Sequence, residues 1–129
     1  MKRIKRERKK DWRMPENAVS VTRPGQWGNP MKIVDEWILI QTELNGRYQM
    51  LCKGDIDLML EIYRFMLALP ATIDVELKMD ETVWNWRMYY ENADFSMLKD
   101  KDLACFCGLD KPCHANILIE KVQKLFPDG

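Results

Sequence analysis

The last part of the sequence, residues 103–125, constrains the fold more than any other segment. It begins with an apolar run, Leu103-Ala104-Cys105-Phe106-Cys107, that has the length and composition of a buried strand. Asp110-Lys111-Pro112 breaks this strand, and apolar residues at helical spacing follow from Cys113 to Leu125. A buried strand followed by a helix is typical of α/β proteins. We therefore expect an α/β fold.

Two other regions predict strands. Residues 18–22 are rich in β-branched side chains and predict a short strand, which would pair in parallel with the strand at 103–107. Residues 33–40 and 47–52 are β-prone and flank Asn45-Gly46, the strongest short hairpin signal. The alternative for this region is one helix over residues 33–44, which Asn45-Gly46 would terminate.

Two further helices are expected in the middle of the chain. Asp55 can cap a helix that runs to about Leu69, and a second helix spans residues 81–93. Together with the helix from Cys113, these elements predict a small single-domain sheet, at least partly parallel, with a hairpin and three helices. At 129 residues the chain has the length of one domain. We expect a flexible basic arm over residues 1–11 and a single α/β domain over residues 12–129.

The charge is distributed unevenly along the chain. The formal net charge is zero, but residues 1–10 carry +6 and the rest of the chain carries −6. A basic arm can bind the phosphates of a nucleic acid, fold back on an acidic body, or remain a solvated tail. The first interpretation makes DNA or RNA the partner of seven residues: Lys2, Arg3, Lys5, Arg6, Arg8, Lys9 and Lys10.

The arm has no apolar core of a secretory signal, and no apolar stretch reaches the roughly 20 residues that a membrane-spanning helix needs. We therefore expect a cytoplasmic protein with reduced thiols and no membrane partner. The sequence also has no phosphate-binding Walker loop, no G-x-G-x-x-G and no H-x-E with P-C-x-x-C. Their absence argues against the common nucleotide hydrolases, Rossmann oxidoreductases and zinc deaminases.

The chemistry of the chain is concentrated in one cluster. Three of the four cysteines and the only histidine lie within ten residues, as Cys105-x-Cys107-x5-Cys113-His114. Alternate residues of a strand face the same side, so Cys105 and Cys107 can point into one space, and the following loop can return Cys113 and His114 to it. Three thiolates and an imidazole match the Cys3His ligand set of structural zinc. All four residues are therefore candidate zinc ligands, although adjacent ligands on a helix diverge by about 100°.

Two other interpretations of the cluster remain open. A thiol at a helix N-terminus has a lowered pKa, so Cys113 could be a nucleophile with His114 as acid or base, or both could line an anion-binding pocket. Alternatively, Cys105 and Cys107 are small buried residues and His114 is a solvated cap. The sequence leaves open whether the protein is an enzyme.

Two blocks of the sequence resemble a known family. The first is Val19-x-Val21-x-Arg23-Pro24-x-x-Trp27-Gly28-Asn29-Pro30, and the second joins Cys105-Phe106-Cys107 to Cys113-His114-Ala115-Asn116-Ile117-Leu118. Both are similar to the V-x-R…W-G-N-P-F and C-W-C-P…C-H-x-D-x-L motifs of an uncharacterised family of small bacterial and phage proteins, a domain of unknown function. The chain departs from these motifs at Met31, Phe106, Gly108 and Asn116. The resemblance implies one site containing Arg23, Asn29 and the Cys/His cluster.

A pocket between the two blocks is the expected functional site. Parallel strands ending near Thr22 and Cys107 would bring the loop from Arg23 to Pro30 beside the cluster, at the sheet edge where α/β proteins bind ligands. There Arg23 could clamp a phosphate, Trp27 could stack on a base and Asn29 could hydrogen-bond it. Each also has a plain structural role: ion-pair partner, core lid and turn residue.

We therefore predict binding or processing of a nucleotide or nucleic acid at this pocket, with Cys105 and Cys107 among the ligand-binding residues. The first alternative is a zinc-stabilised protein-interaction module, such as a phage or mobile-element accessory protein. The second is a small thiol-dependent enzyme in which Cys113 and His114 are catalytic.

Overall fold

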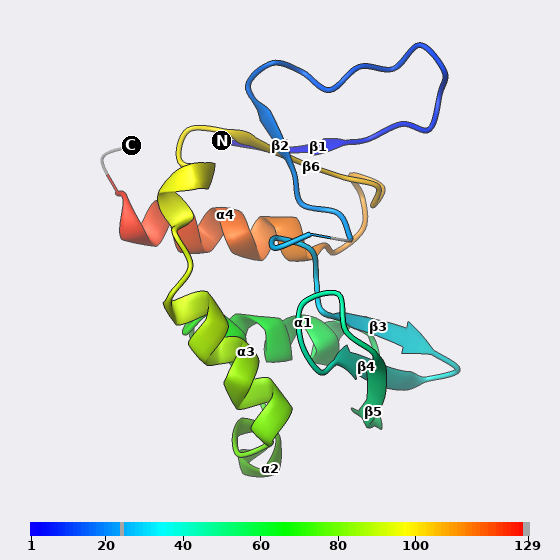
Figure 1. Cartoon of the computed structure of the whole chain (residues 1–129), viewed down its shortest axis with the longest axis vertical. Helices are drawn as coiled ribbons and strands as arrows, with labels where there is room; N and C mark the ends of the chain where they lie inside the picture. Colours follow the sequence, from blue (N-terminus) through cyan, green and yellow to red (C-terminus); the bar gives the residue numbers. More distant parts are fainter. Residues whose placement is uncertain (24, 128–129) are drawn as a thin grey trace. The chain divides into compact units, whose positions relative to one another are not determined.

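The computed structural model describes residues 1–23 and 25–127, and its contacts divide the chain into two compact units. Unit 1 comprises Met1–Gly28 and Asp94–Gly129, and unit 2 comprises Asn29–Ala93 (Figure 1). Pro24, part of the expected ligand loop, lies outside the described residues, as do residues 128 and 129 at the end of the expected domain.

Unit 1 is built on a parallel sheet of three strands with helix α4 packed against it. The strands are β1 (Arg3–Lys5), β2 (Ala18–Ser20) and β6 (Asp102–Cys105), in the order β1-β6-β2. Both neighbours run parallel to β6, with Arg3 opposite Leu103 on one side and Val19 opposite Leu103 on the other. Helix α4 (His114–Leu125) contacts β6 and β1, and the 3-10 helix η1 (Phe95–Leu98) contacts α4 (Figure 1).

The sequence explains this arrangement. Leu103, Ala104 and Cys105 are almost completely buried, because β6 is the central strand and carries apolar side chains on both faces. Helix α4 turns Ala115, Leu118 and Val122 inward at helical spacing. The unit therefore has the layered sheet and helix of an α/β protein.

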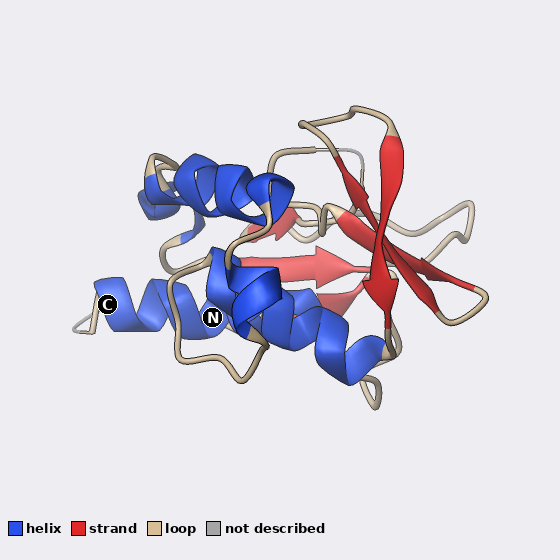
Figure 2. Ribbon diagram, turned by 90° about the horizontal axis from the view of Figure 1, so that it is seen from below, coloured by secondary structure: helices blue, strands red, loops and turns tan. Residues whose placement is uncertain are grey.

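Unit 2 combines an antiparallel sheet with helices. Its strands are β3 (Met31–Val34), β4 (Trp37–Gln41) and β5 (Tyr48–Lys53), in the order β3-β4-β5, and Figure 2 shows them as a twisted sheet. Asp35 and Glu36 turn β3 into β4 with positive φ angles of 50° and 68°. Asn45 (φ 59°) lies in the turn that joins β4 to β5, as its Asn-Gly signal predicts.

The helices of unit 2 begin at aspartate caps. Helix α1 (Ile56–Met66) begins after Asp55, whose carboxylate accepts a hydrogen bond from Leu58 N, and α3 (Glu81–Glu91) begins after Asp80 in the same way. The short helix α2 (Val75–Lys78) precedes α3. Helices α1 and α3 pack on each other, and the Tyr63 and Tyr90 rings meet edge to face at 5.8 Å.

The predicted fold class is confirmed, including the parallel pairing of β2 with β6, the hairpin around Asn45-Gly46 and the three long helices. The alternative helix over residues 33–44 is wrong, because residues 31–34 and 37–41 form strands. The hairpin strands form a sheet separate from the parallel one. Residues 3–5, placed in the expected arm, form strand β1. Among the described residues, no helix has the length and apolar character needed to cross a bilayer.

Candidate metal centre

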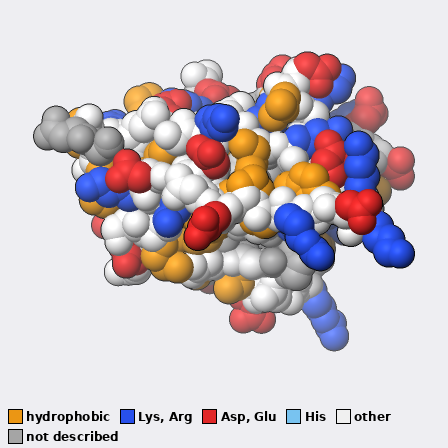
Figure 3. Space-filling view, turned by 90° about the horizontal axis from the view of Figure 1, so that it is seen from above, with side chains coloured by type: hydrophobic (Ala, Val, Ile, Leu, Met, Phe, Trp, Pro, Cys, Tyr) orange, Lys and Arg blue, Asp and Glu red, His pale blue; other side chains and the backbone are white. Residues whose placement is uncertain are grey.

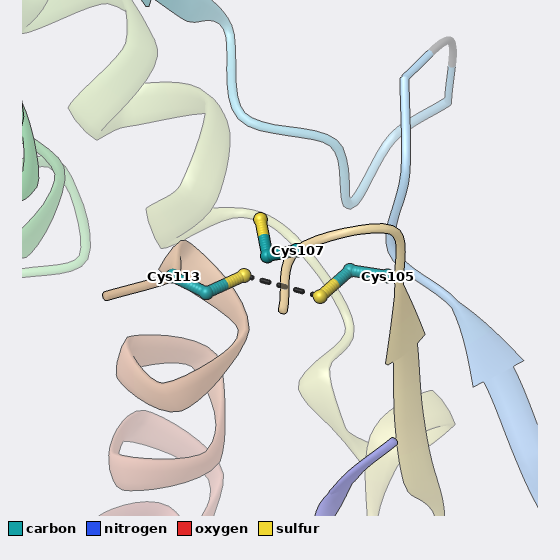
Figure 4. A group of neighbouring side chains, drawn as sticks. All are labelled: Cys105, Cys107 and Cys113. Atoms are coloured by element: carbon teal, nitrogen blue, oxygen red, sulfur yellow. Dashed lines mark hydrogen bonds between the residues drawn. The ribbon is translucent and has the colours of Figure 1, made fainter. Parts of the chain in front are cut away.

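The three clustered cysteines come from one strand–loop–helix segment of unit 1. Cys105 is the last residue of β6, Cys107 lies in the loop that follows, and Cys113 is the N-cap residue of α4. Their sulfur atoms all lie within 4.8 Å of one another. Figure 4 shows the sulfurs of Cys105 and Cys113 pointing toward each other across the gap between strand and helix. The loop thus brings the three thiols together in one site, although their spacing in the sequence is not that of a regular zinc knuckle.

The distances suit a single thiophilic ion. The Sγ atoms of Cys105 and Cys113 are 3.2 Å apart, whereas Zn–S bonds of about 2.3 Å in tetrahedral geometry place two sulfurs about 3.8 Å apart. A shift of about half an ångström would therefore admit the ion. Cys105 and Cys113 are buried but Cys107 is exposed, which gives an ion access from solvent. Among the described His, Cys, Asp and Glu residues, only these three cysteines form such a group.

Hydrogen bonds make the two buried thiols unequal. The hydrogen bond between the Cys105 and Cys113 sulfurs lowers the pKa of Cys113 and raises that of Cys105 well above its usual range. The backbone N–H of Ala115, at the start of α4, also donates to the Cys113 sulfur at 3.5 Å and lowers its pKa further. Of the two buried thiols, Cys113 is therefore the one that ionises first, which suits both metal binding and nucleophilic chemistry.

His114 lies beside the cluster but does not belong to the group of mutually close ligand atoms. Its Nε2 is 2.8 Å from the Val21 carbonyl and 3.2 Å from the Trp27 carbonyl, and because carbonyls only accept, Nε2 carries the proton. Burial lowers the pKa of His114, so the ring is neutral near pH 7 and the lone pair is on Nδ1. That atom is 3.7 Å from the Cys113 sulfur. His114 therefore ties the end of β2 and the following loop to the start of α4.

The predicted ligand-binding residues Arg23, Trp27 and Asn29 have different surroundings. Arg23 is exposed, and its positive charge adds to the effect of burial in lowering the pKa of His114. Trp27 is buried and its ring packs on Phe95 at 5.2 Å, so its indole belongs to the hydrophobic core. Its backbone carbonyl accepts a hydrogen bond from His114. Asn29 belongs to unit 2, where its Oδ1 accepts from Met31 N.

The loop from Arg23 closes tightly at Gly28. A Cβ atom at Gly28 would lie 3.0 Å from Arg23 Cγ and 3.1 Å from Arg23 Cα and N. A side chain at position 28 would therefore push the backbone of Arg23 away. The glycine of the Trp-Gly-Asn-Pro motif has a packing reason within unit 1.

Sequence analysis missed one residue at the cluster. Arg3 in β1 donates from one terminal nitrogen to the Leu109 carbonyl at 2.8 Å, in the loop between Cys107 and Cys113. The only sequence feature that singled out Arg3 was the high density of basic residues around it, and this density suggests contact with nucleic acid. The position of β1 beside β6 brings Arg3 to the thiols instead.

The other basic residues of the N-terminal segment differ in their contacts and exposure. Arg6 donates to the hydroxyls of Ser20 and Thr22, and the guanidinium groups of Arg6 and Arg8 lie 4.7 and 4.0 Å from the centre of the Phe106 ring. Figure 3 shows Lys and Arg side chains projecting from one face among acidic and hydrophobic ones. The segment's exposed basic residues are Lys2, Lys5, Arg8, Lys9 and Lys10.

Comparison with known proteins identifies a family but no activity. No curated protein and no solved structure matches the chain. A family model described as "Domain of unknown function (DUF4326)" matches residues 4–124, nearly the whole chain, including the last two residues of β1 and the cysteine cluster. The chain therefore belongs to the DUF4326 family, a domain of unknown function.

Proposed function

We propose that Cys105, Cys107 and Cys113 bind one zinc ion and leave its fourth coordination position open to a ligand. The observation that carries this proposal is the mutual approach of three sulfur atoms to within 4.8 Å. Structural zinc sites usually have four protein ligands, whereas sites with three protein ligands keep a position for water or substrate. The three-cysteine group fits the second kind.

The chemistry of the donors supports zinc over harder ions. Thiolates select zinc, copper(I) or iron–sulfur chemistry and disfavour magnesium and calcium. The hydrogen bond with Cys105 lowers the pKa of Cys113 and so favours its thiolate, the form that binds metal. His114 is engaged through Nε2 with two carbonyls, so in this proposal it positions the start of α4 and is not a ligand.

The test is the metal content of the protein purified in a reducing buffer, measured by elemental analysis. We expect one zinc per chain in the wild type and in Cys52→Ser, the matched control in unit 2. We expect loss of zinc in Cys107→Ser, whose exposed side chain can change with little effect on packing. A wild type free of zinc that cannot be reconstituted would overturn the proposal. Rapid alkylation of Cys113 in that protein would support the thiol-enzyme alternative.

Nucleic-acid binding by residues 2–10 is a second candidate function, with phosphates as the expected contacts. It is favoured by the exposure of five basic side chains on a segment that β1 attaches to the sheet. Several Lys and Arg contacts to phosphates would make the affinity fall steeply with salt. A nucleotide held near Arg23 and the cluster is the narrower form of this candidate.

Charge substitution is a cleaner test than deletion, because deleting residues 1–10 also removes β1. We expect the double variant Lys9→Gln, Lys10→Gln to weaken binding of a short DNA duplex or RNA strand at low salt and to flatten the salt dependence. Lys124→Gln in α4 is the control. If the wild type binds neither nucleic acid at low salt, the basic residues serve another purpose and this candidate is rejected.

A further inference from the structure

Arg3 occupies a place next to the cysteine cluster that the register of the sheet determines. Opposite residues of parallel strands point to the same face, and so do alternate residues along a strand. Because Arg3 lies opposite Leu103, its side chain shares a face with Leu103 and Cys105. Cys113 at the start of α4 approaches Cys105 from this same side. The guanidinium therefore extends along the layer that contains the thiols.

The orientation of the guanidinium is fixed by the loop that carries the cysteines. One terminal nitrogen of Arg3, Nη2, donates to the Leu109 carbonyl at 2.8 Å. The other, Nη1, is buried and has no hydrogen-bond partner among the described residues. A buried guanidinium N–H without an acceptor destabilises the fold, so its surroundings need explanation.

The sulfur atoms of the cluster are the acceptors that fit. Cys105 lies on the face of the sheet that Arg3 shares, and the Cys113 sulfur lies 3.2 Å from the Cys105 sulfur on that side. The guanidinium and both buried thiols therefore lie on the same face of β6. A cation in this place stabilises thiolates over thiols.

We propose that Arg3 is a positioning residue of the zinc centre, whose Nη1 donates to the thiolates of Cys105 and Cys113 and compensates the charge of the metal site. This inference rests on the proposed zinc function. Three thiolates carry one negative charge more than a divalent ion neutralises, and in a largely buried site that excess is costly. The guanidinium supplies the missing positive charge, while its bond to Leu109 holds the loop between Cys107 and Cys113 in the closed form.

The assignment also separates two roles within the basic segment. Lys5 follows Arg3 on the same strand and shares its face, opposite Cys105, yet its side chain is exposed. A role in charge compensation alone would allow Lys5 to replace Arg3. The planar fork of Arg3 makes one bond to a carbonyl and has a second direction free for sulfur, which an ammonium group cannot reproduce in the same way.

The test is a zinc competition titration against a chromogenic chelator, with full-length wild type, Arg3→Gln, Arg3→Lys and Lys5→Gln. Second-shell substitutions reduce metal affinity about 10- to 100-fold, and we expect a loss in that range for Arg3→Gln. Arg3→Lys should recover part of it, and Lys5→Gln should bind like the wild type. Cobalt-loaded protein gives an independent readout, because loss of N–H···S bonds shifts the sulfur-to-cobalt absorption bands.

The melting temperatures of the metal-free proteins separate metal positioning from simple support of β1. We expect metal-free Arg3→Gln to melt close to metal-free wild type. If it melts as far below the wild type without metal as with it, Arg3 has only a structural role and the inference is overturned. Wild-type zinc affinity in Arg3→Gln overturns it as well, and the zinc proposal then stands. Absence of zinc from the wild type refutes the zinc proposal itself.

Discussion

Replacing His114 with phenylalanine removes the Nε2–H donor that joins the start of α4 to the backbone carbonyls of Val21 and Trp27. The ring is 8% exposed, so water cannot easily replace the lost donor. Leaving a buried acceptor without its partner costs about 1–3 kcal/mol. The Nε2–H group contacts two carbonyl oxygens, that of Val21 at 2.8 Å and that of Trp27 at 3.2 Å, and both lose this donor in the variant. We therefore expect His114→Phe to lower the free energy of unfolding by about 2–4 kcal/mol. That is a large part of the roughly 5–15 kcal/mol of a typical domain.

The assay is equilibrium unfolding in urea with tryptophan fluorescence, in the presence of a chelator so that metal affinity does not enter. His114→Gln is the matched control, because its side-chain amide can still donate near the position of Nε2. We expect it to recover part of the loss. If His114→Phe unfolds within about 0.5 kcal/mol of the wild type, a difference typical of neutral surface changes, the carbonyl bonds contribute nothing and the reasoning is refuted.

The same residue gives a pH signature that can be assigned without ambiguity, since it is the only histidine. Its pKa is lowered in the native state by burial, so below the ordinary value of about 6.5 the unfolded chain takes up a proton before the native one does. Stability is therefore complete above pH 6.5 and decreases as the pH falls, by up to about 1.4 kcal/mol per pH unit. His114→Phe should lack this decrease between pH 7 and 5.5.

Three other substitutions test particular contacts of the fold. Asp55→Ala removes the cap of α1 and should cost about 1 kcal/mol in urea unfolding. Leu118→Ala empties a fully buried position of α4 and should cost about 2–5 kcal/mol by the same measurement. Burial and the Asp80 and Asp74 carboxylates raise the pKa of Cys52. Asp80→Asn keeps an oxygen that can cap α3 but removes one negative charge, which favours the Cys52 thiolate. Iodoacetamide should therefore alkylate Cys52 faster in this variant at neutral pH. An unchanged rate would show that Asp80 does not influence the thiol.

The elements that sequence analysis predicted well are those whose signals are local. Helix α1 has a capping aspartate, apolar residues at helical spacing and Pro70 beyond its end. The hairpin follows from Asn45-Gly46. The continuous apolar run predicts strand β6. The strand ends at Cys105, however, and Cys107 reaches the cluster from the loop that follows.

The elements that were missed depend on distant partners. Strand β1 has a single apolar residue, Ile4, and forms because β6 offers its free edge through bonds such as Arg6 N to the Cys105 carbonyl at 2.7 Å. The turn at Asp35 and Glu36 uses positive φ angles without glycine or asparagine, so no turn signature marked it.

At the site, spacing predicted the three cysteines as neighbours, and the structure brings them together. It could not predict the partners of His114, because backbone carbonyls of Val21 and Trp27 leave no trace in residue identity. Nor could it distinguish Arg3 from the six other basic residues around it, since only the pairing register does so.

The central place of β6 in its sheet has a consequence for the order in which the chain can acquire structure. In the described part of the chain β1 and β2 both pair with β6, yet some 80 residues of chain separate β2 from it, including all of unit 2. During synthesis on a ribosome, which proceeds from the N-terminus, every contact within unit 2 becomes available before β6 emerges. Until then the edges of the first two strands stay unpaired. Unpaired strand edges favour aggregation, against which chaperones protect nascent chains. The thiol site is completed last of all, when Cys113 leaves the exit tunnel and α4 can close on the sheet.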